Sequence, residues 1–249
     1  MTAFAEDRGY EKVAHLYDLF DQKPNIEFFC HYAAQAGEIL DIGAGTGRIA
    51  IPLAERGVHV VCVEPSAAMR RELKKKLAQR PHLASRITLI AADARSFDAG
   101  RTFGAAFLSG TFDHFVDDEE RRAGLSNIAR HLAPGGLLVF DLFLGLMGDS
   151  PLSPAGTVTV DEAEVRRFVG GKVLPGKRKE TVLIFETYQG GLLVDRIEER
   201  SVVGITSREE VHGLLAETGF AVQREWSSYA SAEFEAGDPL LIIEAVKQD

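Results

Sequence analysis

Short apolar runs alternate with amphipathic stretches over roughly the first 150 residues of the chain. Five runs that are rich in aliphatic or aromatic side chains cover residues 39–42, 59–64, 87–91, 103–108 and 137–142. Runs of this length favour buried parallel strands, and the stretches between them favour helices that cover both faces of the sheet. The pattern therefore predicts an α/β fold, in which ligands bind near the carboxyl ends of the strands.

The residues before the first run have a helical, aromatic-rich pattern. A break at Pro24-Asn25 divides residues 10–36 into two predicted helices. We expect residues 1–37 to form a helical lid that precedes a core of residues 38–150. Tyr17 and Phe20 lie in this segment and are candidates for contact with a ligand.

The pattern changes after Gly145. Residues 148–154 predict an exposed linker, and alternating runs at 157–168, 180–188 and 192–205 predict strands. Glycine- or proline-containing pairs at 170–171, 175–176 and 190–191 predict the turns between the strands. We therefore expect residues 151–206 to form an inserted antiparallel β subdomain.

The last part of the chain returns to the core pattern. Residues 207–249 start with Ser207 as a predicted helix N-cap, continue with a helix that ends at Gly219, and finish with two strands at 220–226 and 240–246.

Glycines at alternate positions follow the first predicted strand in the run Asp41-Ile42-Gly43-Ala44-Gly45-Thr46-Gly47. A turn without Cβ atoms can lie flat against a ligand, and the free N–H groups of the next helix favour a polar or anionic group there. Asp41 disfavours a phosphate and favours an ammonium or a sulfonium. The spacing also differs from the G-x-G-x-x-G of dinucleotide enzymes. A glycine-rich turn without a ligand is the alternative interpretation.

Carboxylates stand at the ends of the next two predicted strands. Glu64 can accept hydrogen bonds from both hydroxyls of a ribose, and Asp93 can accept one from the exocyclic amine of adenine while the Ala94 N–H donates to the ring. Pro65 and Met69 start the helix after Glu64, where Met69 can pack on a base. The alternatives are a solvated acid for Glu64, a helix cap for Asp93 and a core position for Met69.

The fourth predicted strand leads into small residues and then aromatic ones. Ser109 and Gly110 leave room for an extended ligand, whereas Phe112, His114 and Phe115 can form the wall of a substrate cavity. Phe143, at the end of the fifth strand, is a further candidate for substrate contact. His114 is the candidate general base, and a structural histidine is the alternative.

Residues 38–142 resemble the core of class I S-adenosylmethionine (SAM)-dependent methyltransferases. The matching residues are Asp41 to Gly47, Glu64, Ala92-Asp93-Ala94 and His131-Leu132-Ala133-Pro134-Gly135-Gly136. The resemblance implies a Rossmann-like fold with a mostly parallel seven-stranded sheet and helices on both faces. It also implies that the glycine loop, with Gly43, Ala44, Gly45 and Gly47, supports the methionine part of SAM, that Glu64 binds the ribose and that Asp93 binds the adenine.

The Tyr17-Asp18 pair and the helices before the core resemble small-molecule N-methyltransferases, including those that act on amino sugars. This resemblance implies that Tyr17 contacts the carboxylate end of the cofactor.

Composition narrows the range of partners. The chain of 249 residues has a formal charge of −9 and a pI of about 5.3, which disfavours nucleic acid and anionic membranes and favours a small-molecule acceptor. Its two cysteines show no disulfide or metal-ligand spacing, and we predict no metal. Without an apolar signal region or a membrane-length run, we expect a cytoplasmic protein. A homodimer is left open.

Three functions follow from these observations. The first is a methyltransferase that acts on a nitrogen or oxygen atom of a small molecule and releases S-adenosylhomocysteine (SAH). The second is a non-enzymatic SAM-binding sensor. The third is a nicotinamide-dependent oxidoreductase, against which the glycine spacing and Asp41 argue.

Overall fold

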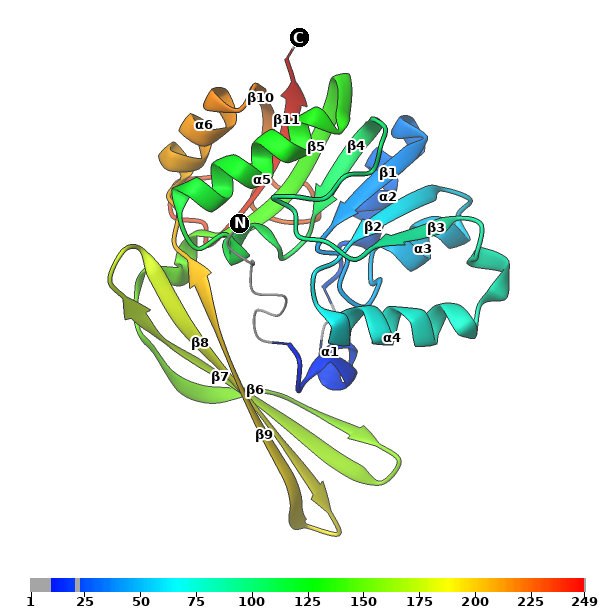
Figure 1. The fold of residues 1–249 in the computed structure, drawn as a ribbon. Helices are drawn as coiled ribbons and strands as arrows, with labels where there is room; N and C mark the ends of the chain where they lie inside the picture. Colours follow the sequence, from blue (N-terminus) through cyan, green and yellow to red (C-terminus); the bar gives the residue numbers. More distant parts are fainter. Residues whose placement is uncertain (1–9, 21–22, 249) are drawn as a thin grey trace.

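A seven-stranded sheet and a four-stranded sheet make up the two parts of the fold (Figure 1). The computed structural model describes residues 10–20 and 23–248. In spatial order the larger sheet consists of β10 (Phe220–Trp226), β11 (Leu240–Lys247), β5 (Leu132–Phe143), β4 (Phe103–Leu108), β1 (Glu38–Ile42), β2 (His59–Val63) and β3 (Ile87–Ile90). Strand β11 is antiparallel to both of its neighbours, and the other pairs are parallel.

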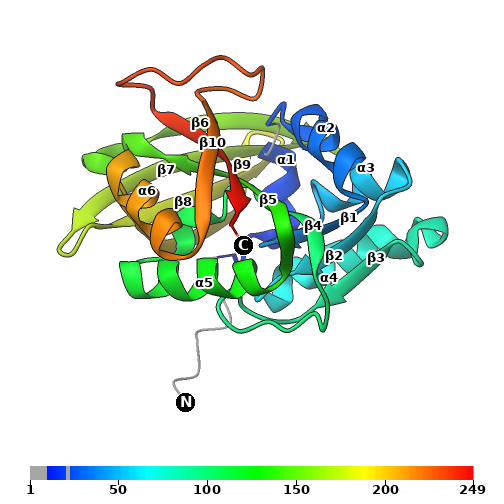
Figure 2. The same ribbon diagram turned by 90° about the horizontal axis from the view of Figure 1, so that it is seen from above.

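Helices cover both faces of this sheet (Figure 2). The longer ones are α1 (Ala14–Phe20), α2 (Ile26–Ala36), α3 (Ala50–Glu55), α4 (Ala67–Ala78), α5 (Asp118–Arg130) and α6 (Arg208–Glu217), and short 3-10 turns cover Pro81–Leu83, Phe112–His114 and Leu144–Met147. Because side chains alternate along a strand, Leu40 and Ile42 of β1 pack in one core cluster with α5 and α6. Ile39 packs in the other cluster with α2 and α3.

The smaller sheet is an antiparallel meander inserted between β5 and α6. Its strands are β6 (Ser150–Val160), β7 (Ala163–Leu174), β8 (Arg178–Gln189) and β9 (Leu192–Gly204), which pair in sequence order. In Figure 1 it lies below the larger sheet, on the side where the parallel strands end, and α1 lies between the two sheets. Val13, next to α1, packs against Val165 and Phe185 of the small sheet.

The predicted fold class is confirmed, with a mostly parallel seven-stranded sheet and an inserted antiparallel sheet. Hairpin turns occur at the predicted positions 175–176 and 190–191, and Ser207 caps α6 in a capping box with Glu210. The predicted domain boundaries stay predictions, and residues 1–9 of the predicted lid lie outside the described residues.

Several local predictions in the insert were wrong. The predicted linker is mostly strand, because β6 begins at Ser150. Pro151 and Pro154 are tolerated in β6 because it is an edge strand of the small sheet. The predicted strand 157–168 is divided by a turn at Asp161 and Glu162, both of which have positive φ.

The glycine pair at 170–171 is not a turn but lies inside β7. A Cβ atom on Gly170 would lie 2.8 Å from the Cα atom of Leu152 on β6, so this glycine permits close approach of two strands. Strand β5 begins at Leu132, earlier than predicted, and includes the Pro134-Gly135-Gly136 run.

Among the described residues, no helix is long and apolar enough to cross a membrane. The expected cytoplasmic location and the expected lack of nucleic-acid and membrane partners stay predictions.

Candidate active site

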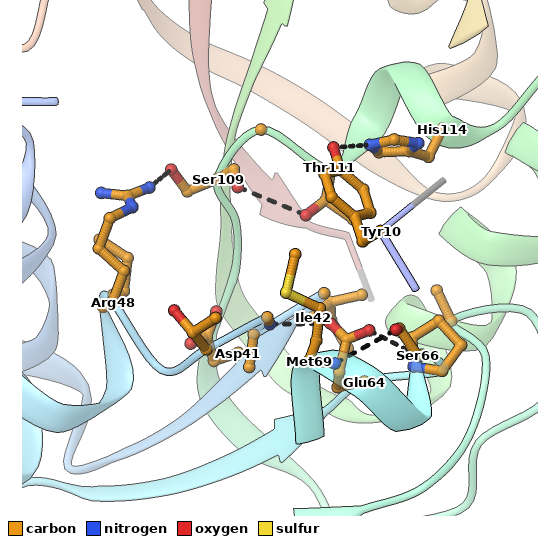
Figure 3. A pocket seen from close by; sticks show the side chains of 18 of the residues that line it. Tyr10, Asp41, Ile42, Arg48, Glu64, Ser66, Met69, Ser109, Thr111 and His114 are labelled. Carbon is orange, nitrogen blue, oxygen red and sulfur yellow. Dashed lines mark hydrogen bonds between the residues drawn. The ribbon is translucent and has the colours of Figure 1, made fainter. Parts of the chain in front are cut away.

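A cleft opens at the carboxyl ends of β1 to β4, and its empty space is about 960 Å³ including the part open to solvent. All predicted cofactor-binding residues except Gly47 line it: Tyr17, Asp41, Gly43, Ala44, Gly45, Glu64, Pro65, Met69, Asp93, Ala94, Ser109 and Gly110. Several other lining residues were not predicted to bind a ligand: Tyr10, Ile42, Thr46, Arg48, Ile49, Ser66 and Thr111. Figure 3 shows how the labelled side chains surround the cleft.

The glycine loop forms the floor of the cleft between β1 and α3. The Gly43 N–H donates to the carbonyl oxygen of Val63 at 2.8 Å, which ties the loop to the end of β2. Gly43 has a positive φ of 69°, and a Cβ atom there would overlap the Thr111 side chain. A side chain at this position would therefore both strain the backbone and fill the cleft.

Gly47, the last glycine of the loop, faces the helices behind the cleft. A Cβ atom there would overlap Leu73 of α4 and lie 3.2 Å from Ile51 of α3. The lack of a side chain at Gly47 therefore allows two helices to pack closely behind the loop, and Gly47 does not line the cleft.

Asp41 is a buried carboxylate at the end of β1. Its exposed fraction is 2%, and its Oδ2 atom has no hydrogen-bond partner among the described residues. Burial raises the pKa of Asp41 to about 7; the nearby Arg48 opposes this shift and Glu64 adds to it. An unsatisfied buried carboxylate oxygen is costly. The site therefore fits a ligand with an ammonium or other cationic donor group.

Arg48 directly follows the glycine loop and lines the cleft. Its guanidinium donates to Asn25, which is fully buried just before α2, and to the Ser109 hydroxyl at 2.9 Å. The Asn25 amide also donates to Ser109, at 3.0 Å. These contacts fix a cation at the same end of the cleft as Asp41 (Figure 3).

The Ser109-Gly110 segment is held in turn by Asp141 at the end of β5. Asp141 accepts hydrogen bonds from the Gly110 N–H at 2.6 Å, the Ser109 hydroxyl at 3.2 Å and the Tyr229 hydroxyl at 2.5 Å. The loop between β10 and β11, which carries Tyr229, therefore helps to fix the wall of the cleft.

Glu64 joins the glycine loop to the start of α4. One carboxylate oxygen accepts from the Gly45 N–H at 2.8 Å and the other from the Ser66 N–H at 2.7 Å. The side chain is thus held in one orientation at the cleft wall.

Asp93 stands at the end of β3, where it faces the same cleft. Both of its oxygens accept from the Arg95 guanidinium, at 2.6 and 2.7 Å, and one also accepts from the Arg95 N–H at 2.9 Å. No helix begins after Asp93. The alternative that Asp93 caps a helix is therefore wrong.

His114 and Tyr10 stand together on another wall of the cleft. The Tyr10 hydroxyl and His114 Nε2 share a hydrogen bond of 3.1 Å, and Tyr10 also contacts Tyr17 edge to face at 5.6 Å between ring centroids. Tyr10 precedes α1 and Tyr17 lies within it, so the segment around α1 contributes two rings to the lining of the cleft.

Helix α1 is fixed over the glycine loop by Asp18. This carboxylate accepts from the Thr46 hydroxyl at 2.6 Å and pairs with Lys76 of α4 at 2.6 Å. Lys76 also donates to the Thr46 carbonyl oxygen at 3.0 Å. The helix therefore covers part of the cleft, as a lid would.

Three aromatic residues predicted to bind the substrate do not line the cleft. Phe112 is fully buried and stacks on Phe140 in the core. Phe20 packs against Phe185 of the small sheet, and Phe143 is 38% exposed. Aromatic side chains near a predicted site are often packing residues, and we assign no ligand contact to these three. No cluster of three or more possible metal ligands occurs among the described residues.

Comparison with known proteins identifies the central part of the chain. Residues 39–136, which include the glycine loop, Glu64 and Asp93, match the model of a family described as a methyltransferase domain. Residues 39–136 are a methyltransferase domain. The match agrees with the predicted family, and the strand order of the larger sheet agrees with the predicted fold.

Relatives by sequence agree with this result. An uncharacterized methyltransferase of Bacillus cytotoxicus is 30% identical over 142 residues, which are 53% of this chain and 64% of that protein. The match therefore covers less than two thirds of the relative.

Solved structures show that the fold extends beyond the methyltransferase domain. The CcbJ methyltransferase of Streptomyces caelestis has a TM-score of 0.82 and 20% identity over 99% of this chain and 100% of that one. SAM-bound CalS10, an amino pentose methyltransferase from Micromonospora echinaspora, has a TM-score of 0.74 and 21% identity over 98% of this chain and 100% of that one. Their similarity covers the inserted sheet as well as the core.

Proposed function

We propose that this protein is an enzyme that transfers the methyl group of SAM to a nitrogen or oxygen atom of a small-molecule acceptor. The observation that carries the proposal is that Asp41, Glu64 and Asp93, from the ends of three adjacent strands, face one cleft. The proposal has two parts, a cofactor site and an acceptor site, and each has its own residues.

In the proposed cofactor site, each polar group of SAM has a candidate partner among the residues that line the cleft. Asp41 would accept from the ammonium and Arg48 would bind the carboxylate of the methionine part, with Tyr17 nearby. Glu64 would accept from the ribose hydroxyls, and Asp93 from the exocyclic amine of adenine. When bound, SAM supplies a methyl group on a positively charged sulfur, which is already a good leaving group.

In the acceptor site, the protein mainly holds the attacking atom in line with the methyl group and excludes water. His114 lies on the cleft wall with Tyr10, and we propose that it takes a proton from the acceptor while the Tyr10 hydroxyl fixes its ring. Strand β9 of the inserted sheet packs at Gly204 against Phe115 and Val116, which follow His114, and the sheet would there limit the size of the acceptor.

The acceptor class is proposed to be an amine or a hydroxyl on a small polar molecule. The resemblance of the whole chain to CalS10, an amino pentose methyltransferase, supports an amino sugar as the first compound to test. The two other functions are less favoured. A pyrophosphate would lie against Asp41, and a sensor would not need an insert beside the cofactor cleft.

Two measurements test the two parts. Isothermal titration calorimetry with SAM, SAH and NAD tests the cofactor site, and we expect binding of SAM and SAH but not of NAD. Radiolabelled SAM with a panel of amino sugars, amines and sugar alcohols tests transfer. Binding of NAD alone would contradict the cofactor assignment, and SAM binding without transfer to any acceptor would favour the sensor.

The role of His114 is tested with His114→Asn. We expect kcat to fall by about 100-fold, a typical loss for a general base, whereas SAH affinity stays within about twofold because the proposed role of the ring concerns the acceptor and not the cofactor. His59→Asn, at the exposed start of β2, is the matched control. An unchanged kcat and pH–rate profile would exclude His114 as the base.

A further inference from the structure

Arg95 is a buried cation between two segments that both line the cleft. Only 2% of its side chain is exposed, and it follows β3 directly after the Asp93-Ala94 pair. Arg95 pairs with Asp93 on one side and with Glu120 of α5 on the other. Arginine suits such a position because its planar fork can hold two carboxylates at once.

On the first side, Arg95 fixes the orientation of Asp93. Two side-chain hydrogen bonds, of 2.6 and 2.7 Å, hold the two carboxylate oxygens in a bidentate pair. The Asp93 side chain is only 16% exposed, and that part faces the cleft. The direction of the remaining lone pairs is therefore set by Arg95.

On the second side, Arg95 reaches the segment that carries His114. Glu120 accepts from Arg95 with one oxygen and from the Val116 N–H, at 3.0 Å, with the other. Val116 follows His114 and Phe115, which line the cleft.

The opposite side of this segment is closed by β9. A Cβ atom on Gly204 would lie 3.2 Å from the Val116 Cα atom and would overlap the Phe115 carbonyl oxygen. Residues 115–116 are thus held between β9 and the Glu120 carboxylate.

We propose that Arg95 is a positioning residue that places Asp93 and the His114-Phe115 segment relative to each other. Loss of the Arg95 guanidinium releases both Asp93 and the His114-Phe115 segment. Loss of the Glu120 charge releases only the His114-Phe115 segment. The part that concerns Asp93 rests on the proposed function, since it takes Asp93 as a cofactor ligand. The part that concerns residues 112–120 rests on contacts alone.

Two conservative variants distinguish the effect of Arg95 on Asp93 from its effect on the His114-Phe115 segment. Arg95→Lys keeps a positive charge but cannot hold two carboxylates in a fork, and Glu120→Gln keeps the shape of the side chain but not its charge. The matched controls are Arg122→Lys, whose guanidinium is half exposed in a pair with Glu217, and Glu119→Gln, which is exposed on the same helix. Each protein is tested for SAH affinity by calorimetry, for amide hydrogen exchange with and without SAH, and for its thermal midpoint.

We expect Arg95→Lys to weaken SAH binding about tenfold or more, the effect of losing a charged hydrogen bond. We also expect it to speed amide exchange in residues 112–120 about tenfold, with no change in β1 and β4. In Glu120→Gln exchange in the same residues rises, but SAH affinity stays within about twofold. Both controls behave as the wild type.

Three results would overturn the proposal. The first is SAH affinity in Arg95→Lys within twofold of the wild type, and the second is exchange in Glu120→Gln that matches Glu119→Gln. The third is a rise in exchange spread evenly over the chain in Arg95→Lys, which indicates general destabilisation. If the wild type does not bind SAH, the proposed function fails, and the exchange comparison still decides whether Arg95 holds the His114 segment.

Discussion

Each of the three carboxylates that face the cleft has a different set of neighbours. Glu64 is held by two backbone N–H groups, Asp93 by a guanidinium, and Asp41 keeps one oxygen without a partner among the described residues. Fixed carboxylates suit neutral donors such as hydroxyls and amines, whereas an unsatisfied one suits a cation. The differences among the neighbours therefore support the proposal that each carboxylate binds a different part of SAM.

Glu64 gives the sharpest test of this arrangement at a single residue. Glu64→Gln keeps an acceptor oxygen but loses the charge, and Glu64→Ala loses both. We expect SAH affinity to fall by about 1–3 kcal/mol in Glu64→Ala and by less in Glu64→Gln, because hydrogen bonds to a charged group are the stronger ones. Calorimetry measures the affinity.

Because Glu64 also accepts from Gly45 and Ser66, the thermal midpoint of each variant must be measured in parallel. A folded Glu64→Ala protein with wild-type SAH affinity would remove Glu64 from the cofactor site.

The sequence predicts cleft residues well where they stand at strand ends. Asp41, Glu64 and Asp93 each follow an apolar run, so their common edge follows from the parallel sheet. Arg48 and Tyr10 were missed because their positions depend on distant contacts, with Ser109 and Asn25 for Arg48 and with His114 for Tyr10. Only the position of Arg48 next to the glycine loop was a signal that could have been used.

At the scale of elements, the core strands and the last two strands of the insert were predicted closely, whereas β6 and β7 were not. Core strands are buried on both faces and show as apolar runs, whereas strands of the small sheet are half exposed and contain glycine and proline. The prolines of β6 are typical of a linker in sequence but occur on an edge that needs no partner. Local composition therefore predicts linkers or turns wrongly at edge strands such as β6.

The contact between the insert and the core is tested by Gly204→Ala at the end of β9. A Cβ atom there would overlap the Arg121 side chain and the Phe115 carbonyl oxygen, so the core or β9 must shift. We expect a loss of about 1–3 kcal/mol in the free energy of unfolding, the range for overpacking. Urea denaturation monitored by circular dichroism measures it.

Gly213→Ala in α6 is the matched control. A Cβ atom on this glycine would have no atom within 4 Å among the described residues beyond its chain neighbours and the backbone of its own helix, and alanine in a helix interior is favoured over glycine by roughly 0.5–1 kcal/mol. We therefore expect Gly204→Ala to lower the free energy of unfolding and Gly213→Ala to raise it. Equal stability of both variants would mean that β9 does not press on the Phe115 segment.

At the scale of the whole molecule, burial of acidic groups links stability to pH. Burial raises the pKa of both Asp41 and Asp113 from 3.8 to about 7. Asp113 lies in the 3-10 turn after β4, accepts from the Phe143 N–H at 3.2 Å, and keeps its Oδ1 atom without a partner among the described residues. Between pH 4 and 7 the folded state therefore holds protons that the unfolded state has released.

The sign of the effect follows from this difference. Stability from these two groups is fully present below about pH 4 and is lost as the pH rises through 7, by at most about 4 kcal/mol for each group. We expect the free energy of unfolding to fall between pH 5.5 and 8 in the wild type, and to fall less in Asp113→Asn. Asp195→Asn, at an exposed position of β9, is the control. Parallel curves for Asp113→Asn and the wild type would contradict the prediction.

Ligand binding should change this pH dependence through Asp41 alone. An ammonium beside Asp41 favours the ionised form of this carboxylate, so a saturating ligand lowers the pKa of Asp41. The part of the stability loss above pH 5.5 that comes from Asp41 is then removed. With SAH present, we therefore expect the wild-type curve to flatten and the Asp113→Asn curve to flatten by the same amount. In Asp41→Asn the curve should keep its slope, because no carboxylate remains for the ligand to ionise. A ligand-induced flattening that persists in Asp41→Asn would place the cationic end of the ligand away from β1.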